Sequence, residues 1–311
     1  MIVTILVYKI ISLFLILVAG FGLVRFKVIE ADHSRTLSEI SLYLICPCVF
    51  ISAFQIEYTP AVRDGLLLGL GAAVFIHILL ISLAFFLEKL LHLRAVEKAS
   101  IIYTNAGNLI IPIVAAVLGP EWLIYTCPYM GVQAALMWSH GRAIVKGEVG
   151  FDIRKIFLNI NIVSIAFGLL LFLLDIKIWP PLLDAMQSMA VMIGPCAMLV
   201  AGMLIGKMRL GELLNFRRLP LVVLIRLLFL PVLTMVCLVF LGKLVSIPDS
   251  ERVLLVTLLA TVAPSASTIV QMAQVYDNEP QYASAINVGT TMLCILTIPM
   301  FVMLYEMFAL M

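Results

Sequence analysis

Charged residues are scarce in this sequence. Of its 311 residues, 12% are charged and 63% are hydrophobic, and the mean hydropathy is +1.16. A soluble domain usually carries about 25% charged residues, because its surface must be hydrated. The composition therefore excludes an ordinary soluble domain and predicts a surface that faces lipid. The net charge of +2 is small and gives no basis for nucleic-acid binding.

The sequence also lacks the residue clusters of metal and redox sites. No two cysteines form a CxxC pair, and no group of histidines accompanies them. We therefore predict neither a metal nor a cofactor. A nucleotide-binding loop and an amphipathic regulatory tail are missing as well. The six cysteines all fall in apolar runs: Cys46, Cys48, Cys127, Cys196, Cys237 and Cys294.

Long apolar runs dominate what is present. Runs of about 20 apolar residues can cross a bilayer as helices. The first run has no basic n-region and no small-residue cleavage site, so we expect a retained helix rather than a signal peptide. The fold class predicted is an all-α integral membrane protein with ten transmembrane helices. The predicted spans are 3–24, 35–55, 64–87, 98–118, 122–144, 156–175, 181–206, 219–242, 252–275 and 281–308.

Short matches between the two halves indicate a duplication. The tripeptide FGL at 21–23 recurs at 167–169, a shift of 146, and Pro47 recurs as Pro195, a shift of 148. We predict two five-helix repeats, 1–144 and 156–311, joined by a short cytoplasmic connector at 145–155. An odd number of spans makes the second repeat enter from the opposite side, which is the inverted repeat common in secondary transporters. Pro47 and Pro195 either kink the second and seventh helices or line one wall of a cavity.

Basic residues predict the orientation. With the N-terminus outside, the cytoplasmic loops hold fourteen Lys and Arg residues and the outer loops hold four. Cytoplasmic loops carry this excess in membrane proteins. We therefore expect a multi-pass protein of the cell membrane (plasma or inner membrane) with both termini on the extracytoplasmic side.

Two predicted spans are interrupted by polar residues. TNAGNLIIP at 104–112 contains two asparagines and a glycine, and Pro112 cannot donate a helical hydrogen bond. APSASTIVQ at 263–271 is its counterpart, with Pro264 matching Asn105 at a shift of 159. Such breaks at mid-membrane either serve helix packing or line a cavity. A matched pair in an inverted repeat favours a substrate site.

The candidate residues follow from these two segments. Backbone N–H groups at broken helix ends carry partial positive charge, which suits a carboxylate. The predicted substrate-binding residues are Asn105, Ala106, Gly107, Asn108, Pro264, Ser265, Ser267, Thr268 and Gln271, and the predicted helix-breaking residues are Pro47, Pro112, Pro195 and Pro264.

The charges restrict the mechanism. No acidic residue falls in either segment, which argues against a carboxylate-based proton relay or sodium site. The sequence does not exclude a sodium site formed by carbonyl, hydroxyl and amide oxygens. Arg226 either anchors its helix at the cytoplasmic interface or attracts an anionic substrate. The hypothesis is a carrier of small organic acids, by uniport or exchange. The side chains open to sodium are those of Thr104, Ser265, Ser267, Thr268 and Gln271.

These motifs resemble a known family. The run NAGNLIIP at 105–112 resembles the GNTGFLGIP-like motif of the auxin efflux carrier family, which includes bacterial malate and malonate permease-like proteins. APSASTIVQMAQVYDNEPQYAS resembles the second signature of that family, and Arg226 with Pro231 resembles its eighth helix. Ala106, Asn108 and Ile110 depart from the first motif, which leaves the substrate open.

The resemblance implies a fold shared with bile-acid/sodium symporters. In that fold, helices 1, 2, 6 and 7 form a scaffold, often dimeric, and helices 3–5 and 8–10 form a transport domain. The broken helices 4 and 9 cross at their centres, where the substrate binds. The implied partners are a small organic acid, the lipid bilayer and a second copy of the chain.

Three functions are alternatives to a carrier of this kind: a sodium-coupled symporter, an intramembrane enzyme and a sensor. A sodium-coupled symporter would share the fold and differ in a sodium site beside the crossing. An intramembrane enzyme would need facing ionisable residues, yet of the four histidines only His77 lies well inside a predicted span. A sensor without transport would not need two broken helices around one cavity. We therefore predict a carrier and no enzyme.

Overall fold

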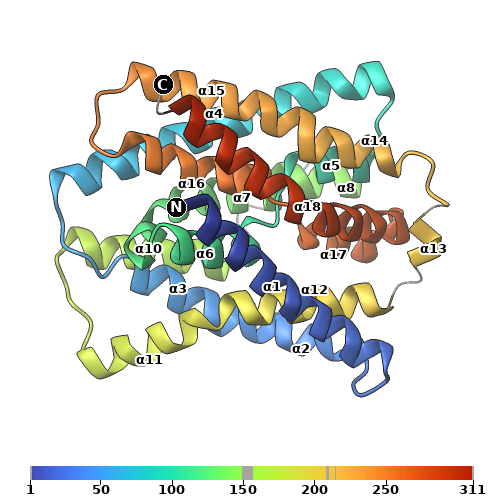
Figure 1. Cartoon of the computed structure of the whole chain (residues 1–311), viewed down its shortest axis with the longest axis horizontal. Helices are drawn as coiled ribbons and strands as arrows, with labels where there is room; N and C mark the ends of the chain where they lie inside the picture. The colour runs from blue at the N-terminus through green and yellow to red at the C-terminus, as the bar shows by residue number, and fades with distance from the viewer. Residues whose placement is uncertain (1, 149–156, 208–209, 214, 310–311) are drawn as a thin grey trace.

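The chain is helical throughout its described part. The computed structural model describes residues 2–148, 157–207, 210–213 and 215–309, and these residues contain no strand apart from one isolated bridge. The helices run back and forth along the long axis of the molecule, and α1 begins and α18 ends in the left half of Figure 1. Most of the predicted connector 145–155 lies outside the described residues.

The helix bounds group into two parts along the chain. The first part contains α1 (Ile2–Arg25), α2 (His33–Ile40), η1 (Ser41–Ile45), α3 (Cys46–Ala53), α4 (Pro60–Leu91), α5 (Ala95–Ile102), α6 (Ala106–Val117), η2 (Pro120–Tyr125), α7 (Thr126–Leu136), η3 (Met137–Gly141) and α8 (Arg142–Lys146). The second contains α10 (Ile160–Leu173), α11 (Pro180–Val191), α12 (Ile193–Lys207), α13 (Leu210–Leu213), α14 (Leu219–Leu224), η4 (Ile225–Phe229), α15 (Leu230–Leu244), α16 (Ser250–Val262), α17 (Ser267–Val275) and α18 (Pro280–Ala309).

Six helical stretches in the described residues are long and apolar enough to cross a bilayer. They are Tyr8–Arg25, His33–Ala53, Pro60–Leu91, Pro180–Lys207, Leu219–Leu244 and Pro280–Ala309. The predicted spans 98–118 and 252–275 are each divided into two shorter helices, and α10 is a shorter apolar helix. Length and composition therefore support a multi-pass membrane protein with six candidate spans.

Local sequence explains where α4 and α10 begin. Thr59 caps α4, because its hydroxyl accepts a hydrogen bond from the Val62 N–H at 3.2 Å, and Pro60 follows at the first helical position. Asn159 caps α10 in the same way, accepting from the Asn161 N–H at 3.0 Å. Both caps satisfy N–H groups that the helix itself leaves unpaired.

The prolines act differently from one another. Pro47 follows the π-helical turn η1, and Pro231 follows the π-helical turn η4, as expected where a proline removes a helical hydrogen bond. Pro195 lies in the first turn of α12, just after α11 ends. Pro112 was predicted to break its helix, and this prediction is wrong: Pro112 lies inside α6, which continues to Val117. The interruption ends at Asn105, before the proline.

Glycines bring α1 and α12 into backbone contact. A Cβ atom on Gly202 of α12 would lie 2.0 Å from the carbonyl oxygen of Leu17, and one on Gly20 of α1 would lie 2.5 Å from that of Leu199. Small residues allow this close approach between membrane helices. The C-terminal part of α1 is therefore packed tightly against α12.

A separate apolar cluster joins the α3 region to α6, η2, α7, α10 and α12. We call it the Phe50 cluster, after its fully buried phenylalanine. Its side chains are all buried, and none is charged. The members are Ile45, Cys46, Val49, Phe50, Ala53, Phe54, Ile111, Ile124, Cys127, Phe172, Ile193 and Cys196.

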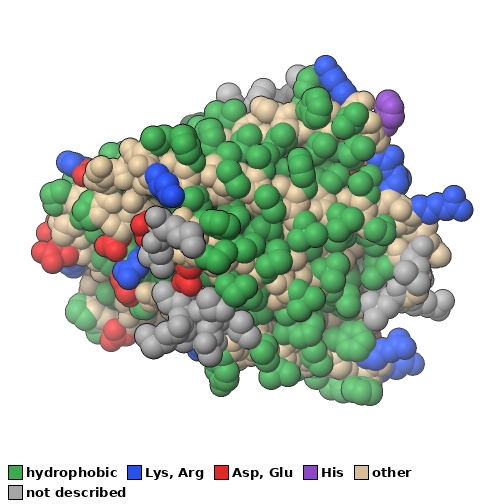
Figure 2. Space-filling view, turned by 45° about the horizontal axis from the view of Figure 1, so that its top comes forward, with side chains coloured by type: hydrophobic (Ala, Val, Ile, Leu, Met, Phe, Trp, Pro, Cys, Tyr) green, Lys and Arg blue, Asp and Glu red, His purple; other side chains and the backbone are tan. Residues whose placement is uncertain are grey.

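The surface agrees with a bilayer environment. Figure 2 shows hydrophobic side chains over the middle of one face, with charged side chains gathered toward the two ends of the long axis. Many large apolar side chains are exposed, for example Phe240 at 65% and Leu296 at 72%. Such a band is the expected contact surface for lipid chains.

Candidate functional site

Two helix interruptions meet in the interior. The first break, residues 103–105, separates α5 from α6, and the second break, residues 263–266, separates α16 from α17. Thr104 and Ser265 form an isolated antiparallel bridge. On either side of it, Asn105 N–H donates to the Pro264 carbonyl at 2.8 Å, and Ala266 N–H donates to the Tyr103 carbonyl at 3.1 Å.

The sequence of each break explains its extended backbone. Ala263 precedes a proline, which disfavours helical torsions at Ala263, and its ψ is 155°. Asn105 has φ −85° and ψ 46°, outside the helical region, and it is the N-cap of α6. Its side chain makes no capping hydrogen bond to α6. The two predicted breaks are therefore present, although shorter than the segments proposed from the sequence.

Side chains from neighbouring helices satisfy the backbone of both central residues. The Gln133 side-chain oxygen on α7 accepts from the Thr104 N–H at 3.1 Å and from its hydroxyl at 2.7 Å, and the Gln133 amide donates to the Thr104 carbonyl at 2.9 Å. On α18, Asn287 donates to the Ser265 carbonyl at 2.7 Å, and the Thr290 hydroxyl accepts from the Ser265 N–H at 3.2 Å. Each break is thus held by the next long helical stretch in the chain.

These three residues were missed in the sequence. Gln133, Asn287 and Thr290 are polar and buried within apolar runs, and that contrast was the available signal. A polar side chain inside a predicted span is costly unless it is paired. It therefore indicates a partner with exposed backbone groups, which the breaks supply.

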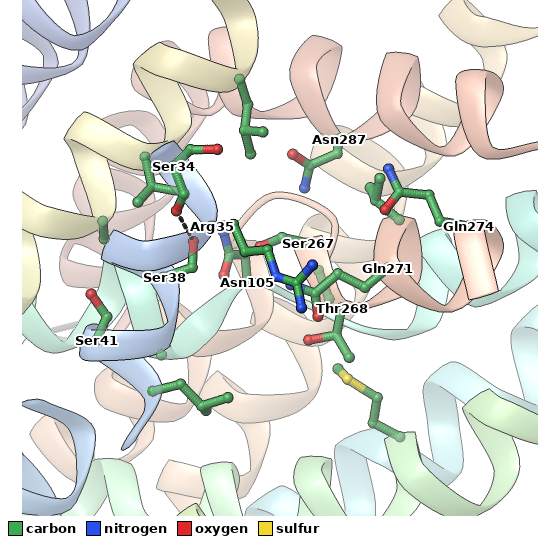
Figure 3. Close-up of a pocket in the computed structure, with 18 of the residues that line it drawn as sticks. Ser34, Arg35, Ser38, Ser41, Asn105, Ser267, Thr268, Gln271, Gln274 and Asn287 are labelled. Carbon is green, nitrogen blue, oxygen red and sulfur yellow. Dashed lines mark hydrogen bonds between the residues drawn. The ribbon is translucent and has the colours of Figure 1, made fainter. Parts of the chain in front are cut away.

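A polar cavity lies beside the two breaks. Its volume is about 2180 Å³, and both halves of the chain line it. Figure 3 shows Asn105 from the first break together with Ser267, Thr268 and Gln271 of α17, with Ser34, Arg35 and Ser38 from α2 and Asn287 from α18 also on the lining. The structure thus brings Asn105, Gly107, Ser267, Thr268 and Gln271 of the predicted set to one cavity.

Other predicted residues lie off the cavity surface. Ala106 and Ser265 are each only 1% exposed and do not belong to the described lining. Pro264 supplies a backbone carbonyl to the other break rather than a cavity surface. Asn108 belongs to α6, and its side chain lies outside what the structure describes. Pro47, Pro112 and Pro195 are likewise absent from the described lining.

The charged residues on the described lining form ion pairs. Arg35 binds Glu39 at 2.9 Å, and Lys207 binds Asp32 at 2.7 Å. The Lys207 hydrogen bond and charge lower the pKa of Asp32 below its ordinary value. The side chains of Asp32 and Lys207 are 80% and 61% exposed, so the cavity reaches solvent there. Beside the breaks, the described lining is built of amides, hydroxyls and apolar groups.

Arg226, the residue predicted to anchor its helix or attract an anion, lies away from the described cavity lining. The residue is 0% exposed and does not belong to the described cavity lining. Its guanidinium donates to the carbonyls of Ile101 at 3.0 Å, Thr261 at 2.7 Å and Ala263 at 2.7 Å. It therefore binds the C-terminal ends of α5 and α16, on the opposite side of each break from α6 and α17.

The described residues contain no group of three or more His, Cys, Asp or Glu side chains that could hold a metal ion, and the six cysteines are free thiols. His77 is buried, and its Nδ1 lies 2.8 Å from the Ala73 carbonyl of its own helix. Its ring packs on Tyr129 with centroids 4.8 Å apart. This environment is one of helix packing.

The apolar helices and the exposed apolar side chains support a multi-pass membrane protein. Residues 5–150, just under half of the chain, match a family model described as "Membrane transport protein", and this similarity indicates a membrane transporter. This match supports the auxin efflux carrier family, the family that the two sequence motifs resemble. A comparison with curated proteins gives no match.

Proposed function

We propose that this transporter is a secondary carrier of small organic anions, such as carboxylates, which bind in the cavity beside the two breaks. One observation carries the proposal: α6 and α17 begin at the cavity, whereas the C-terminal ends of α5 and α16 are bonded to Arg226. Anions bind at helix N-termini, because the N–H groups there are unpaired and the dipole is positive.

The electrostatic balance favours an anion. Each helix N-terminus carries the equivalent of about half a positive charge, so α6 and α17 together present about one. The opposing C-terminal charges are compensated by the guanidinium of Arg226. The charged residues of the described lining form pairs near the mouth, so no unpaired carboxylate on that lining repels an anion.

The polar side chains beside the breaks supply the remaining contacts. Asn105 and Gln271 carry amides, and Ser267 and Thr268 carry hydroxyls; all four line the cavity. Amide and hydroxyl donors orient a carboxylate without the desolvation cost of a buried lysine or arginine. In this proposal, Asn105 is the principal side-chain donor, since it is the N-cap of α6 and lies on the lining.

The proposal includes an architecture of ten spans in two inverted five-helix repeats, with broken helices 4 and 9 crossing at the site. The pairing of the breaks supports it, as does the holding of each break by the following helix. Spans 1, 2, 6 and 7 form the scaffold. The contact between α1 (span 1) and α12 (part of span 7) supports this grouping. Helices 3–5 and 8–10 form a transport domain that moves against the scaffold to give alternating access. A homodimer through the scaffold completes the proposal.

The orientation proposed is that both termini are extracytoplasmic in the cell membrane. The cavity mouth at Asp32 and Lys207 then faces the cytoplasm, together with the basic loops. An inside-negative potential contributes about 2.3 kcal/mol per 100 mV to the exit of a monovalent anion. Export, by uniport or exchange, is therefore the favoured direction.

Transport in proteoliposomes tests this function. Purified protein is reconstituted with an internal carboxylate, and uptake of the same labelled acid is followed under counterflow. The runs are made in sodium, potassium and choline salts, with the sodium-coupled symporter of the bile-acid type as the alternative. We expect uptake of at least one small carboxylate in all three salts. A strict requirement for sodium would support the alternative, and no uptake of any acid would contradict the proposal.

A further inference from the structure

Arg226 is a fully buried cation whose described partners are backbone carbonyls. Its side chain is 0% exposed, and no carboxylate of the described residues forms an ion pair with it. The cost of burying an unpaired charge in a membrane is several kcal/mol by most scales. The three carbonyl hydrogen bonds must therefore supply the compensation that a carboxylate usually gives.

The carbonyls come from two helix ends. Ile101 is in the last turn of α5, Thr261 is in the last turn of α16, and Ala263 is the C-cap of α16. The last carbonyls of a helix have no intrahelical partner. Each C-terminus carries the equivalent of about half a negative charge, so the two together match the single positive charge of one guanidinium.

In carriers with interrupted helices, the C-terminal end of a half-helix is a known type of cation site. There, half-helix C-terminal ends and unwound carbonyls coordinate the coupling cation, because they offer oxygen ligands and partial negative charge. In this chain the same type of ligand set is already bonded to a side chain. The geometry leaves the two C-termini neutralised whether or not a free cation is present.

We infer that Arg226 is a built-in cation that takes the place of a coupling ion at the C-terminal ends of α5 and α16. The ligand class of this site, once the side chain is removed, is a monovalent cation or a guanidinium ion. If the protein is the carrier proposed above, it should then transport its substrate without a sodium gradient. The cation site itself does not depend on which solute is carried.

The shape of the guanidinium matters as well as its charge. Two of its nitrogens reach three carbonyls on two helices, with donor–acceptor distances between 2.7 and 3.0 Å. A lysine ammonium is a point charge that cannot span the same fork. Arg226→Lys should therefore keep the neutralisation but hold the two helix ends less firmly.

The test is thermal unfolding of the purified protein in sodium, potassium, choline and methylguanidinium chlorides at equal ionic strength. The variants are Arg226→Ala and Arg226→Lys, with Arg63→Ala as the control, because the Arg63 side chain is 52% exposed and far along the chain from both breaks. We expect the wild type and Arg63→Ala to unfold at the same temperature in all four salts. Arg226→Ala should unfold earlier in choline and recover in a saturable way with methylguanidinium or sodium.

Two outcomes would overturn the inference. One is a folded Arg226→Ala protein whose unfolding temperature is the same in all four salts. The other is saturable stabilisation of the wild type by sodium relative to choline. This measurement on the wild type tests the inference even when Arg226→Ala fails to fold. Arg226→Lys should fold and stay indifferent to sodium, and a sodium requirement in that variant would also count against the inference.

A transport assay distinguishes a failure of this inference from a failure of the proposed function. In proteoliposomes, counterflow by the wild type should be equal in sodium and choline, and counterflow by Arg226→Ala should fall at least tenfold in choline and rise again in sodium. If no acid is transported by any variant, the proposed function fails. The unfolding data would still decide whether Arg226 occupies a cation site.

Discussion

Thr104 and Ser265 face each other across an antiparallel bridge, although 161 positions separate them in the chain. The flanking hydrogen bonds, Asn105 to Pro264 and Ala266 to Tyr103, make this contact a short two-stranded ladder inside a helical membrane protein. The ladder fixes the starts of α6 and α17 relative to each other. In the proposed anion site, a ligand at one helix N-terminus would therefore also be positioned for the second.

The side chains that hold the ladder should be important for stability. Gln133→Ala removes three hydrogen bonds and leaves the buried backbone of Thr104 without its partners. An unsatisfied buried polar group costs about 1–3 kcal/mol, so we expect a clearly lower unfolding temperature. The measurement is thermal unfolding in detergent. Gln274→Ala is the matched control, because Gln274 is exposed on the cavity wall, and its unfolding temperature should stay near that of the wild type.

Asn287→Ala tests the second side of the ladder. The Asn287 amide donates to the Ser265 carbonyl, and the same helix provides Thr290 for the Ser265 N–H. We expect a loss of stability in the same range as for Gln133→Ala, about 1–3 kcal/mol. Because both residues hold one ladder, the double variant should lose less than the sum of the single effects. Strict additivity would indicate that the two halves of the ladder are independent.

The α1–α12 contact gives a prediction about the proposed scaffold. Gly202→Ala places a methyl group 2.0 Å from the Leu17 carbonyl oxygen and 2.7 Å from the Phe21 backbone nitrogen. Backbone atoms cannot move aside as a flexible side chain can, so α1 and α12 must separate. We expect a loss of about 1–3 kcal/mol or more.

Gly71→Ala is the matched control for this glycine. A Cβ atom at Gly71 meets nothing within 4 Å, and the residue lies inside α4. Alanine is favoured over glycine in a helix interior by about 1 kcal/mol. Unfolding of Gly71→Ala at or above the wild-type temperature, beside a large decrease for Gly202→Ala, is the expected pair of results. Equal effects would show that backbone contact between α1 and α12 is unimportant.

Glu97 connects three segments at the end of the molecule that carries the basic loops. Its side chain is 0% exposed, accepts from the Tyr282 hydroxyl at 2.9 Å, and lies 2.9 Å from the Arg218 guanidinium. The Arg94 N–H also donates to it at 2.8 Å. Glu97→Gln keeps the size but removes the charge between two arginines, and hydrogen bonds to charged groups are worth about 1.5–3 kcal/mol each. We expect a decrease of this order in the free energy of unfolding.

Glu88→Gln is the control for Glu97→Gln. Glu88 binds Lys98 at 2.7 Å, but its side chain is 37% exposed. Exposed ion pairs contribute about 0–1 kcal/mol, so this variant should unfold close to the wild-type temperature. A decrease as large as that of Glu97→Gln would show that burial is not what makes the Glu97 contacts strong.

The positions of most helices along the chain could be predicted from the sequence, because apolar runs and their polar ends are local signals. Most predicted spans overlap the observed helices to within a few residues at each end, as 3–24 does with α1 and 281–308 does with α18. Pro112 shows the limit of such reasoning. A proline removes one helical hydrogen bond, yet α6 continues through Pro112, whose ring lies against Gly194 of α12.

The site could be predicted only in part. Asn105, Ser267, Thr268 and Gln271 carry their own signal, since polar residues interrupt an apolar run. Gln133 and Asn287 are also polar residues within apolar runs, but they are distant in sequence from the breaks, so the sequence did not show that they pair with them. Arg226 was visible as a buried charge, but its acceptors are backbone carbonyls, which every residue has, so no sequence pattern could identify them.

The most direct test of the anion site is thermal stabilisation of the purified protein by a panel of monocarboxylates, dicarboxylates and indole acids. A ligand that binds only the folded state stabilises by RT ln(1 + [L]/Kd), about 2.7 kcal/mol at a hundredfold excess over Kd. Asn105→Ala is compared with Gln187→Ala, an exposed residue of α11 that is not on the described cavity lining. We expect at least one acid to stabilise the wild type and Gln187→Ala equally in sodium and potassium, with at least tenfold weaker binding to Asn105→Ala. Stabilisation that Asn105→Ala retains in full, or that requires sodium, would contradict this account.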